Sequence, residues 1–173
     1  AEMIDGDVSL EGIFIDAKTS LTYEVYFNNE FVYSTVVNGA KTGAVTIPEG
    51  LARDYVELTA DKQTITSLPA TVRINATWTA PMKVATPADT TWYNLKVSNQ
   101  PRWVSSGNYT PNVYFIDETY ITTDYALWAL TGNPYSGFRL INKAMGPTMV
   151  LASASPKGSA KAGGNTYATL LPA

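Results

Sequence analysis

The feature that most constrains the fold of this chain is a segment that occurs twice. Tyr93 and Leu95 in the first copy correspond to Phe138 and Leu140 in the second, at a constant spacing of 45 residues. Repetition at such a period is typical of supersecondary units that bury one shared core. A third copy at the same spacing would begin beyond Ala173, the last residue of the chain. The repeat therefore predicts a piece of a longer repeated architecture.

Composition favours a folded chain made of strands. The chain has 173 residues, of which 45% are apolar and 16% are charged, so one ordinary domain or two small ones can bury a core. It contains 11 tyrosines and many threonines, which are enriched in strands, and it lacks leucine-rich helical runs. These features predict an all-β fold.

The residue types that are missing exclude several functions. There is no cysteine and no histidine, so disulfides, thiolate chemistry, Ser-His-Asp catalysis and histidine-based zinc sites are excluded. The net charge is −3 with 12 scattered basic residues, which argues against binding nucleic acid through phosphates. No apolar run approaches the ~20 residues of a membrane span. No catalytic residue, metal site or cofactor is predicted, and the chain is not expected to be an enzyme.

Alternating patterns predict strands in the first half. Residues 21–27 alternate between apolar and polar, Asn28-Asn29 supplies turn residues, and residues 30–37 form a second strand-like run. This combination predicts a β-hairpin. Residues 71–78 alternate in the same way, whereas residues 51–58 fit either a helical turn or a strand. The first half is thus all-β or α+β.

A change in composition predicts a domain boundary. Between Pro81 and Asp89 the sequence becomes rich in Ala, Thr and Pro, as linkers are. We expect a small strand-rich module over residues 1–85 and a second module over residues 86–173.

The second half resembles a known module. The residues that carry this resemblance are Trp92-Tyr93-x-Leu95-Lys96, Asp124 to Phe138, Asn142-Lys143 and Gly163 to Tyr167. They resemble β-trefoil modules of the ricin-B/fascin-like kind on large secreted or surface proteins of gut Bacteroidetes. Trp128 fits the tryptophan of the Q-x-W pattern in ricin-like lectins, although Ala126 stands at the glutamine position.

A weaker resemblance covers the first half. The stretch from Thr22 to Trp78 is similar to the small β-grasp or Ig-like module that often precedes that trefoil. Together the two resemblances imply a β-grasp/Ig-like domain followed by a trefoil-like domain with two of its three repeats. A trefoil with two repeats would leave apolar core surface and strand edges open.

Aromatic residues are the candidate ligand-binding groups. Flat rings in a stretch rich in Gly, Asn and Pro can stack on sugars, or else they pack the fold itself. The candidates in this stretch are Trp103, Tyr109, Tyr114 and Tyr120. The other three tryptophans lie in strand-like patterns and are expected in cores: Trp78, Trp92 and Trp128.

The trefoil resemblance implies a function without catalysis. It points to a module of a secreted or cell-surface bacterial protein that binds a glycan or mediates adhesion. The alternative is a structural spacer, or an assembly subunit whose open trefoil is completed by another protein chain.

Overall fold

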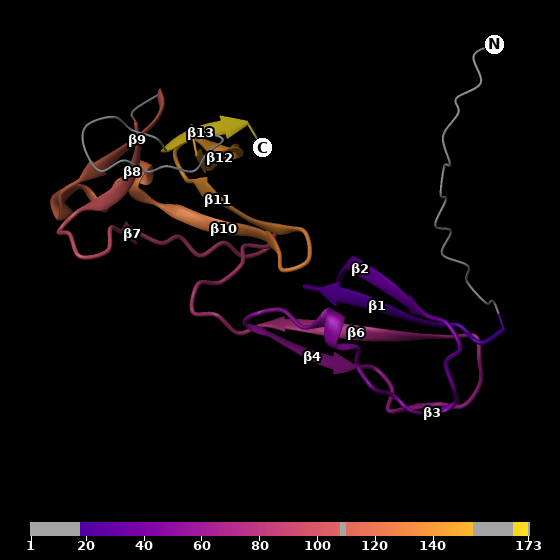
Figure 1. Ribbon diagram of the computed structural model, residues 1–173. Coiled ribbons are helices and arrows are strands. Elements are labelled where there is room, and N and C mark those ends of the chain that lie inside the picture. The colour runs from indigo at the N-terminus through magenta and orange to yellow at the C-terminus, as the bar shows by residue number, and fades with distance from the viewer. Residues whose placement is uncertain (1–17, 108–109, 154–167, 173) are drawn as a thin grey trace, which may run out of the picture. The chain divides into compact units, whose positions relative to one another are not determined.

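The protein is an all-β chain, as its composition predicts (Figure 1). The computed structural model describes residues 18–107, 110–153 and 168–172. Within these ranges the ordered elements are strands and three short 3-10 turns, with no α-helix, so the α+β alternative for the first half is not realised. The 3-10 turns are η1 (Glu49–Leu51), η2 (Glu118–Tyr120) and η3 (Asp124–Ala126). None of the described elements is a helix long and apolar enough to cross a bilayer.

The chain divides into two compact units. Unit 1 contains the described residues up to Glu49 together with Leu58–Asn75. Unit 2 contains Gly50–Glu57 and the described residues from Ala76 onward. The second half of the chain and its repeat thus lie in unit 2.

A four-stranded sheet holds the first strands, in the order β2-β1-β6-β4. Its members are β1 (Leu21–Phe27), β2 (Glu30–Val37), β4 (Val56–Ala60) and β6 (Ala70–Trp78). A separate two-stranded sheet pairs β3 (Gly43–Ala44) with β5 (Thr64–Ile65).

The buried face of β1 follows directly from its alternation. Leu21, Tyr23, Val25 and Phe27 are all buried, while the residues between them are partly exposed. Successive side chains of a strand leave opposite faces, so one apolar face is enough to anchor the strand. The Tyr23 hydroxyl donates a hydrogen bond of 2.9 Å to the Thr46 carbonyl. Burial also raises the pKa of the Tyr23 hydroxyl.

The predicted hairpin is confirmed. β1 pairs antiparallel with β2 from Leu21 opposite Val37 to Phe27 opposite Glu30. Between them Asn28 and Asn29 have φ values of 50° and 65°. Asparagine tolerates this left-handed conformation better than most residues, and two such residues make the turn whose twist matches the strands.

The remaining pattern predictions in the first half are resolved by β6 and β4. In β6, Val72 and Ile74 are fully buried, but Trp78 at its end is only partly buried. Residues 51–58 contain the end of η1 and the start of β4. The helical turn comes first and the strand follows, so both interpretations of this segment hold for different residues.

A seven-stranded sheet forms most of unit 2, in the order β10-β11-β12-β13-β9-β8-β7. Its strands are β7 (Leu95–Lys96), β8 (Trp103–Gly107), β9 (Thr110–Ile116), β10 (Trp128–Asn133), β11 (Gly137–Asn142), β12 (Gly146–Ser153) and β13 (Ala168–Pro172). A closed barrel, which a complete trefoil would have, is not formed by the described strands. The trefoil relationship of this unit stays a prediction.

The sequence repeat corresponds to two hairpins. In the first copy β7 pairs with β8, where Leu95 lies opposite Val104. The second copy pairs β11 with β12, where Ile141 lies opposite Val150. Each copy therefore contributes an antiparallel strand pair to the same sheet.

The core of unit 2 is built around Trp128. This side chain and Val113 are buried together, at 0% and 4% exposure. The partly buried side chains packed against them are Leu95, Val104, Leu140, Met145, Met149 and Leu151. The predicted core position of Trp128 is confirmed, whereas Trp92, like Trp78, is only partly buried. Two of the three expected core tryptophans therefore lie at the margin of the packing.

The connection between β10 and β11 is a tight turn. The Asn133 Oδ1 accepts hydrogen bonds of 2.9 Å from the backbone N–H groups of Tyr135 and Ser136. The Tyr135 hydroxyl donates to the Leu51 carbonyl, and the Arg53 guanidinium lies 4.8 Å from the tyrosine ring centre. Burial raises the pKa of Tyr135, and the positive charge of Arg53 opposes this rise.

Candidate functional site

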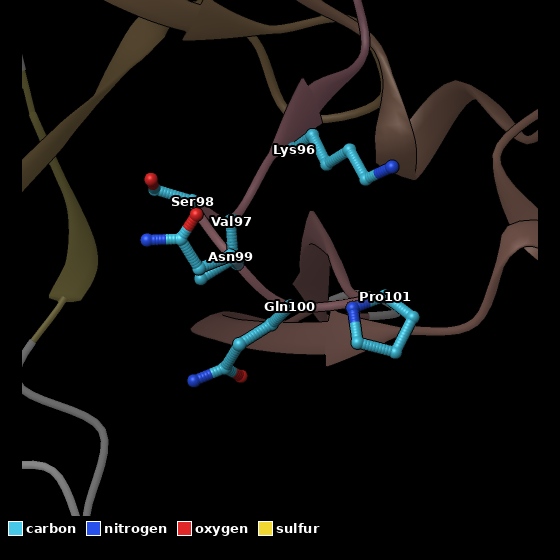
Figure 2. Close-up of a pocket in the computed structure, with 6 residues that line it drawn as sticks. All are labelled: Lys96, Val97, Ser98, Asn99, Gln100 and Pro101. Carbon is cyan, nitrogen blue, oxygen red and sulfur yellow. The ribbon is translucent and has the colours of Figure 1, made fainter.

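The candidate site is the turn that joins β7 to β8 in the first copy of the repeat. It encloses a shallow hollow of about 400 Å³. Its lining residues are Lys96, Val97, Ser98, Asn99, Gln100 and Pro101. Figure 2 shows the Lys96 side chain extending away from Ser98 and Asn99. The hollow is therefore formed by one continuous stretch of chain.

Backbone hydrogen bonds and one left-handed residue shape this turn. The Val97 N–H donates to the Arg102 carbonyl at 2.9 Å, and the Gln100 N–H donates to the Val97 carbonyl at 3.3 Å. Asn99 has a φ of 59°, which asparagine tolerates. These hydrogen bonds thus fix the backbone conformation of the turn next to the strands.

The polar side chains of the turn have no partners within the described protein. Ser98, Asn99 and Gln100 are exposed, and none of their side chains makes a hydrogen bond to another described residue. Their hydroxyl and amide groups supply donors and acceptors together. The turn therefore presents hydrogen-bond donors and acceptors that are accessible to solvent or to a ligand.

In the second copy, side chains of the equivalent turn form hydrogen bonds and an ion pair with the rest of the protein. The Asn142 Oδ1 accepts hydrogen bonds from the backbone N–H groups of Ala144 and Met145 at 3.1 and 3.3 Å. Lys143 forms an ion pair of 2.8 Å with Asp124. The two copies share a hairpin but differ in how much of the turn is free to bind.

Trp103 lies beside the hollow, on the neighbouring strand. It is the cross-strand partner of Lys96, whose Nζ lies 5.4 Å from the centre of the indole ring. The ring is partly buried, and its N–H has no hydrogen-bond partner among the described residues. By contrast, the indole N–H of Trp78 donates to the Met82 carbonyl and that of Trp128 to the Val104 carbonyl. Trp103 thus keeps a ring edge and a donor available.

Tyr114 lies on the same face as Trp103. Trp103 is opposite Ile116 and Ser105 is opposite Tyr114, so the two aromatic residues are diagonal neighbours across β8 and β9. Tyr114 is 48% exposed, and its hydroxyl accepts a hydrogen bond of 3.3 Å from the Asn112 amide. The structure therefore brings two of the four predicted aromatic residues to one face.

Among the described residues, Tyr120 does not belong to this face. Tyr120 is 59% exposed but lies on η2, beyond the end of β9. Tyr109 lies outside the described residues. Of the predicted group, Trp103 and Tyr114 are the two that the structure places on a common face.

Charged groups near the turn are arranged on opposite faces. Arg102 and Asp117 form an exposed ion pair of 2.6 Å. Arg102 directly precedes Trp103, the first residue of β8, so its side chain leaves the other face. Lys96 has no ion-pair partner among the described residues. The side of the sheet that carries Lys96 and Trp103 thus has a positive charge that no described residue compensates.

The site offers groups that recognise a ligand. It combines a partly exposed indole, amide and hydroxyl side chains, and a lysine, which together provide stacking, hydrogen bonds and charge. Across the described part of the chain, no three acidic, histidine or cysteine side chains gather where they could hold a metal ion.

Sequence reasoning missed the turn itself. The aromatic residues were visible in the sequence, but Lys96 and residues 98–100 were not selected. A signal was present, because the two copies of the repeat differ at the turn: Ser-Asn-Gln follows Val97, whereas Lys-Ala-Met follows Asn142. Comparing the copies position by position points to the segment that has diverged. No protein-family model, curated protein or solved structure matches the chain, so its function is inferred from the chemistry of this site.

Proposed function

We propose that this chain is a non-catalytic glycan-binding module of a secreted or cell-surface bacterial protein. The binding site is the Trp103 face, which we define as Trp103, Tyr114 and Lys96 together with the turn residues 97–101. The resemblance to ricin-B/fascin-like trefoils supports the class of protein, and the chemistry of the face supports the class of ligand.

The observation that carries the proposal is the indole N–H of Trp103, which has no hydrogen-bond partner among the described residues, beside a hollow lined by exposed polar side chains. Indole N–H groups usually find a partner when they are shielded from water. A sugar hydroxyl would accept this hydrogen bond, while the apolar C–H face of the sugar ring would cover the indole. Asn99 and Gln100 would bind the neighbouring hydroxyl groups through their amides.

The scaffold suits such a site because it is rigid where the ring is attached. Trp103 is held between Lys96 on β7 and Ile116 on β9, in the regular ladder of a sheet. A residue fixed on two sides loses little conformational entropy when it binds. Binding modules need this more than they need a deep cavity, which agrees with the shallow form of the hollow.

Trp103→Ala should weaken glycan binding at least about tenfold, because it removes the stacking surface and the free donor, and a tenfold change equals about 1.4 kcal/mol. A glycan array first identifies an oligosaccharide that binds, and calorimetry then compares the wild type with the variant. Phe31→Ala is the matched control, since Phe31 is a 56% exposed aromatic residue in unit 1. Binding by Trp103→Ala at wild-type strength would contradict the proposed site.

One observation favours a second candidate function, assembly with another chain. Phe115 shares a face of β9 with the buried Val113, yet it is 63% exposed. Its cross-strand partner Val104 packs against the core of unit 2. The apolar face of the sheet therefore extends from the buried Val113 to the solvent-exposed Phe115. An assembly subunit would use such an exposed apolar surface for contact with another chain.

Assembly predicts that the protein forms a defined oligomer in solution and that Phe115→Ser returns it to a monomer. Exposed apolar surface drives association roughly in proportion to its area, and Phe115 is the exposed aromatic residue that continues the apolar face of β9. Light scattering coupled to size exclusion gives the mass of each species. Tyr120→Ser, which changes an exposed aromatic residue on η2, is the control. A monomeric wild type would rule out this second candidate.

A further inference from the structure

We propose that the glycan bound at the Trp103 face is anionic, and that Lys96 selects it by pairing with a carboxylate or sulfate group on the sugar. This inference rests on the proposed glycan-binding function and names the chemical class of its ligand.

Lys96 is a cation with no counter-charge among the described residues. The described ion pairs join Arg102 to Asp117 and Lys143 to Asp124, and Lys96 takes part in neither. No further charged contact involves its Nζ within the described chain. The Nζ lies 5.4 Å from the centre of the Trp103 ring. The ammonium group is therefore available to an anion that approaches from solvent.

Among the described residues, the cross-strand rows around Lys96 contain no acidic residue that would repel such an anion. Lys96, Trp103 and Ile116 form one cross-strand row, and Ser105 and Tyr114 form the next. Asp117 follows Ile116 with an extended backbone, so its carboxylate leaves the opposite face, where it pairs with Arg102. The alternation of the strands thus separates the acidic side chain from the binding face.

Lys96 also lies between the two parts of the site, which are the hollow at the turn and the Trp103 ring. It lines the hollow with the turn residues, and its Nζ lies 5.4 Å from the centre of the Trp103 ring. Figure 2 shows the lysine reaching away from Ser98 and Asn99, so the ammonium and the amides are spread along the turn. A ring stacked on Trp103 would therefore place one substituent near Nζ and others near the amides.

The ligand chemistry follows from this arrangement. A sugar that carries a carboxylate or a sulfate combines an apolar ring face, several hydroxyl groups and one fixed negative charge. The charge replaces the water around Nζ, and the pair lies next to an aromatic surface. An exposed pair of this kind is modest and sensitive to salt, so Lys96 should tune selectivity while Trp103 provides the base affinity.

The inference is tested with three oligosaccharides of equal length: a hexuronate, a sulfated glycan and a neutral glycan. Each is titrated into the wild type, Lys96→Gln, Trp103→Ala and Lys41→Gln, at low and at moderate salt. Lys41 is an exposed lysine in unit 1, so Lys41→Gln changes the net charge equally without touching the site. A thermal melt of each variant shows whether it is folded.

Wild-type protein should bind at least one anionic glycan about two- to fivefold more tightly than the neutral one, because an exposed ion pair contributes up to about 1 kcal/mol. The Lys96→Gln change should abolish that preference, so that the anionic glycans bind no more tightly than the neutral one. Added salt should reduce the preference in the wild type and in Lys41→Gln. Comparison of the hexuronate with the sulfated glycan shows which anion the site takes.

Two outcomes would overturn the inference in distinguishable ways. If neutral and anionic glycans bind equally, or if Lys96→Gln keeps the preference, then Lys96 does not select the ligand, although loss of binding in Trp103→Ala would still support the proposed function. If the folded wild type binds none of the three, both the inference and this form of the glycan proposal fail.

Discussion

Trp128→Ala is expected to lower the free energy of unfolding of unit 2 by about 3–5 kcal/mol, the usual cost of removing a fully buried aromatic side chain. Trp128 is 0% exposed and lies among side chains from several strands of the same sheet. Its removal leaves a cavity at the centre of the unit. It also leaves the Val104 carbonyl without the hydrogen bond of 2.9 Å that the indole donates.

Urea denaturation followed by far-ultraviolet circular dichroism measures this loss. Trp128→Phe separates the two causes, because it keeps most of the apolar volume and loses the donor, at an expected cost of about 1–3 kcal/mol. Trp92→Phe makes the same change at a partly buried position of the same unit and should cost less. Equal losses for Trp128→Phe and Trp92→Phe would show that Trp128 is not the centre of the core.

Asn142→Leu should destabilise unit 2 by a similar amount, about 3–5 kcal/mol, for an electrostatic reason. Asn142 is 0% exposed, and its Nδ2 donates to the carbonyls of Tyr125 and Leu127 at 2.7 and 3.2 Å. Its Oδ1 accepts a hydrogen bond of 2.9 Å from the Ser106 hydroxyl. Leucine has nearly the same volume but serves none of these groups, and each stranded buried group costs about 1–3 kcal/mol.

The same urea experiment tests Asn142→Leu, with Asn112→Leu as its control. Asn112 is exposed and its amide bonds only to the Tyr114 hydroxyl among the described residues, so this change should be nearly neutral. Ser106→Ala combined with Asn142→Leu should lose less than the sum of the two single changes, because both remove the same hydrogen bond. Full additivity would mean that the two residues act independently.

The sequence predicts the fold well wherever one face of a strand decides its position. Leu21, Tyr23, Val25 and Phe27 specify the buried face of β1, and Asn28-Asn29 specifies the turn that follows. The repeat likewise predicts two similar supersecondary units, and the structure shows that each contains a hairpin. These features are local, so pattern and turn chemistry are sufficient to find them.

Features that depend on packing between distant segments were not predictable in the same way. Trp78 and Trp128 both follow alternating or aromatic-rich patterns, yet only Trp128 is fully buried. The difference depends on which side chains from other strands cover each ring. The buried role of Asn142 is a further case, since its partners lie up to 36 residues away in the chain.

The candidate site was predictable in its aromatic part alone. Trp103 and Tyr114 are conspicuous in the sequence, but their common face depends on the register of β8 and β9. Lys96 joins them because β7 pairs with β8. A lysine in a single sequence carries no sign that its counter-charge is missing, so only the arrangement of neighbouring strands identifies it.

The contrast between the two repeat turns has a consequence for how such a module can diversify. In the second copy, the turn is joined to the core through Asn142, and a change there affects folding. In the first copy, the side chains at the tip of the turn make no hydrogen bond to a described residue, so changing them should not affect folding. These are the side chains of Ser98, Asn99 and Gln100. One hairpin turn is thus bound to the scaffold, whereas the side chains at the tip of the other can be changed without removing a contact between described residues. Residues 98–100 are the natural place for evolution, or for a designed library, to change what the module recognises.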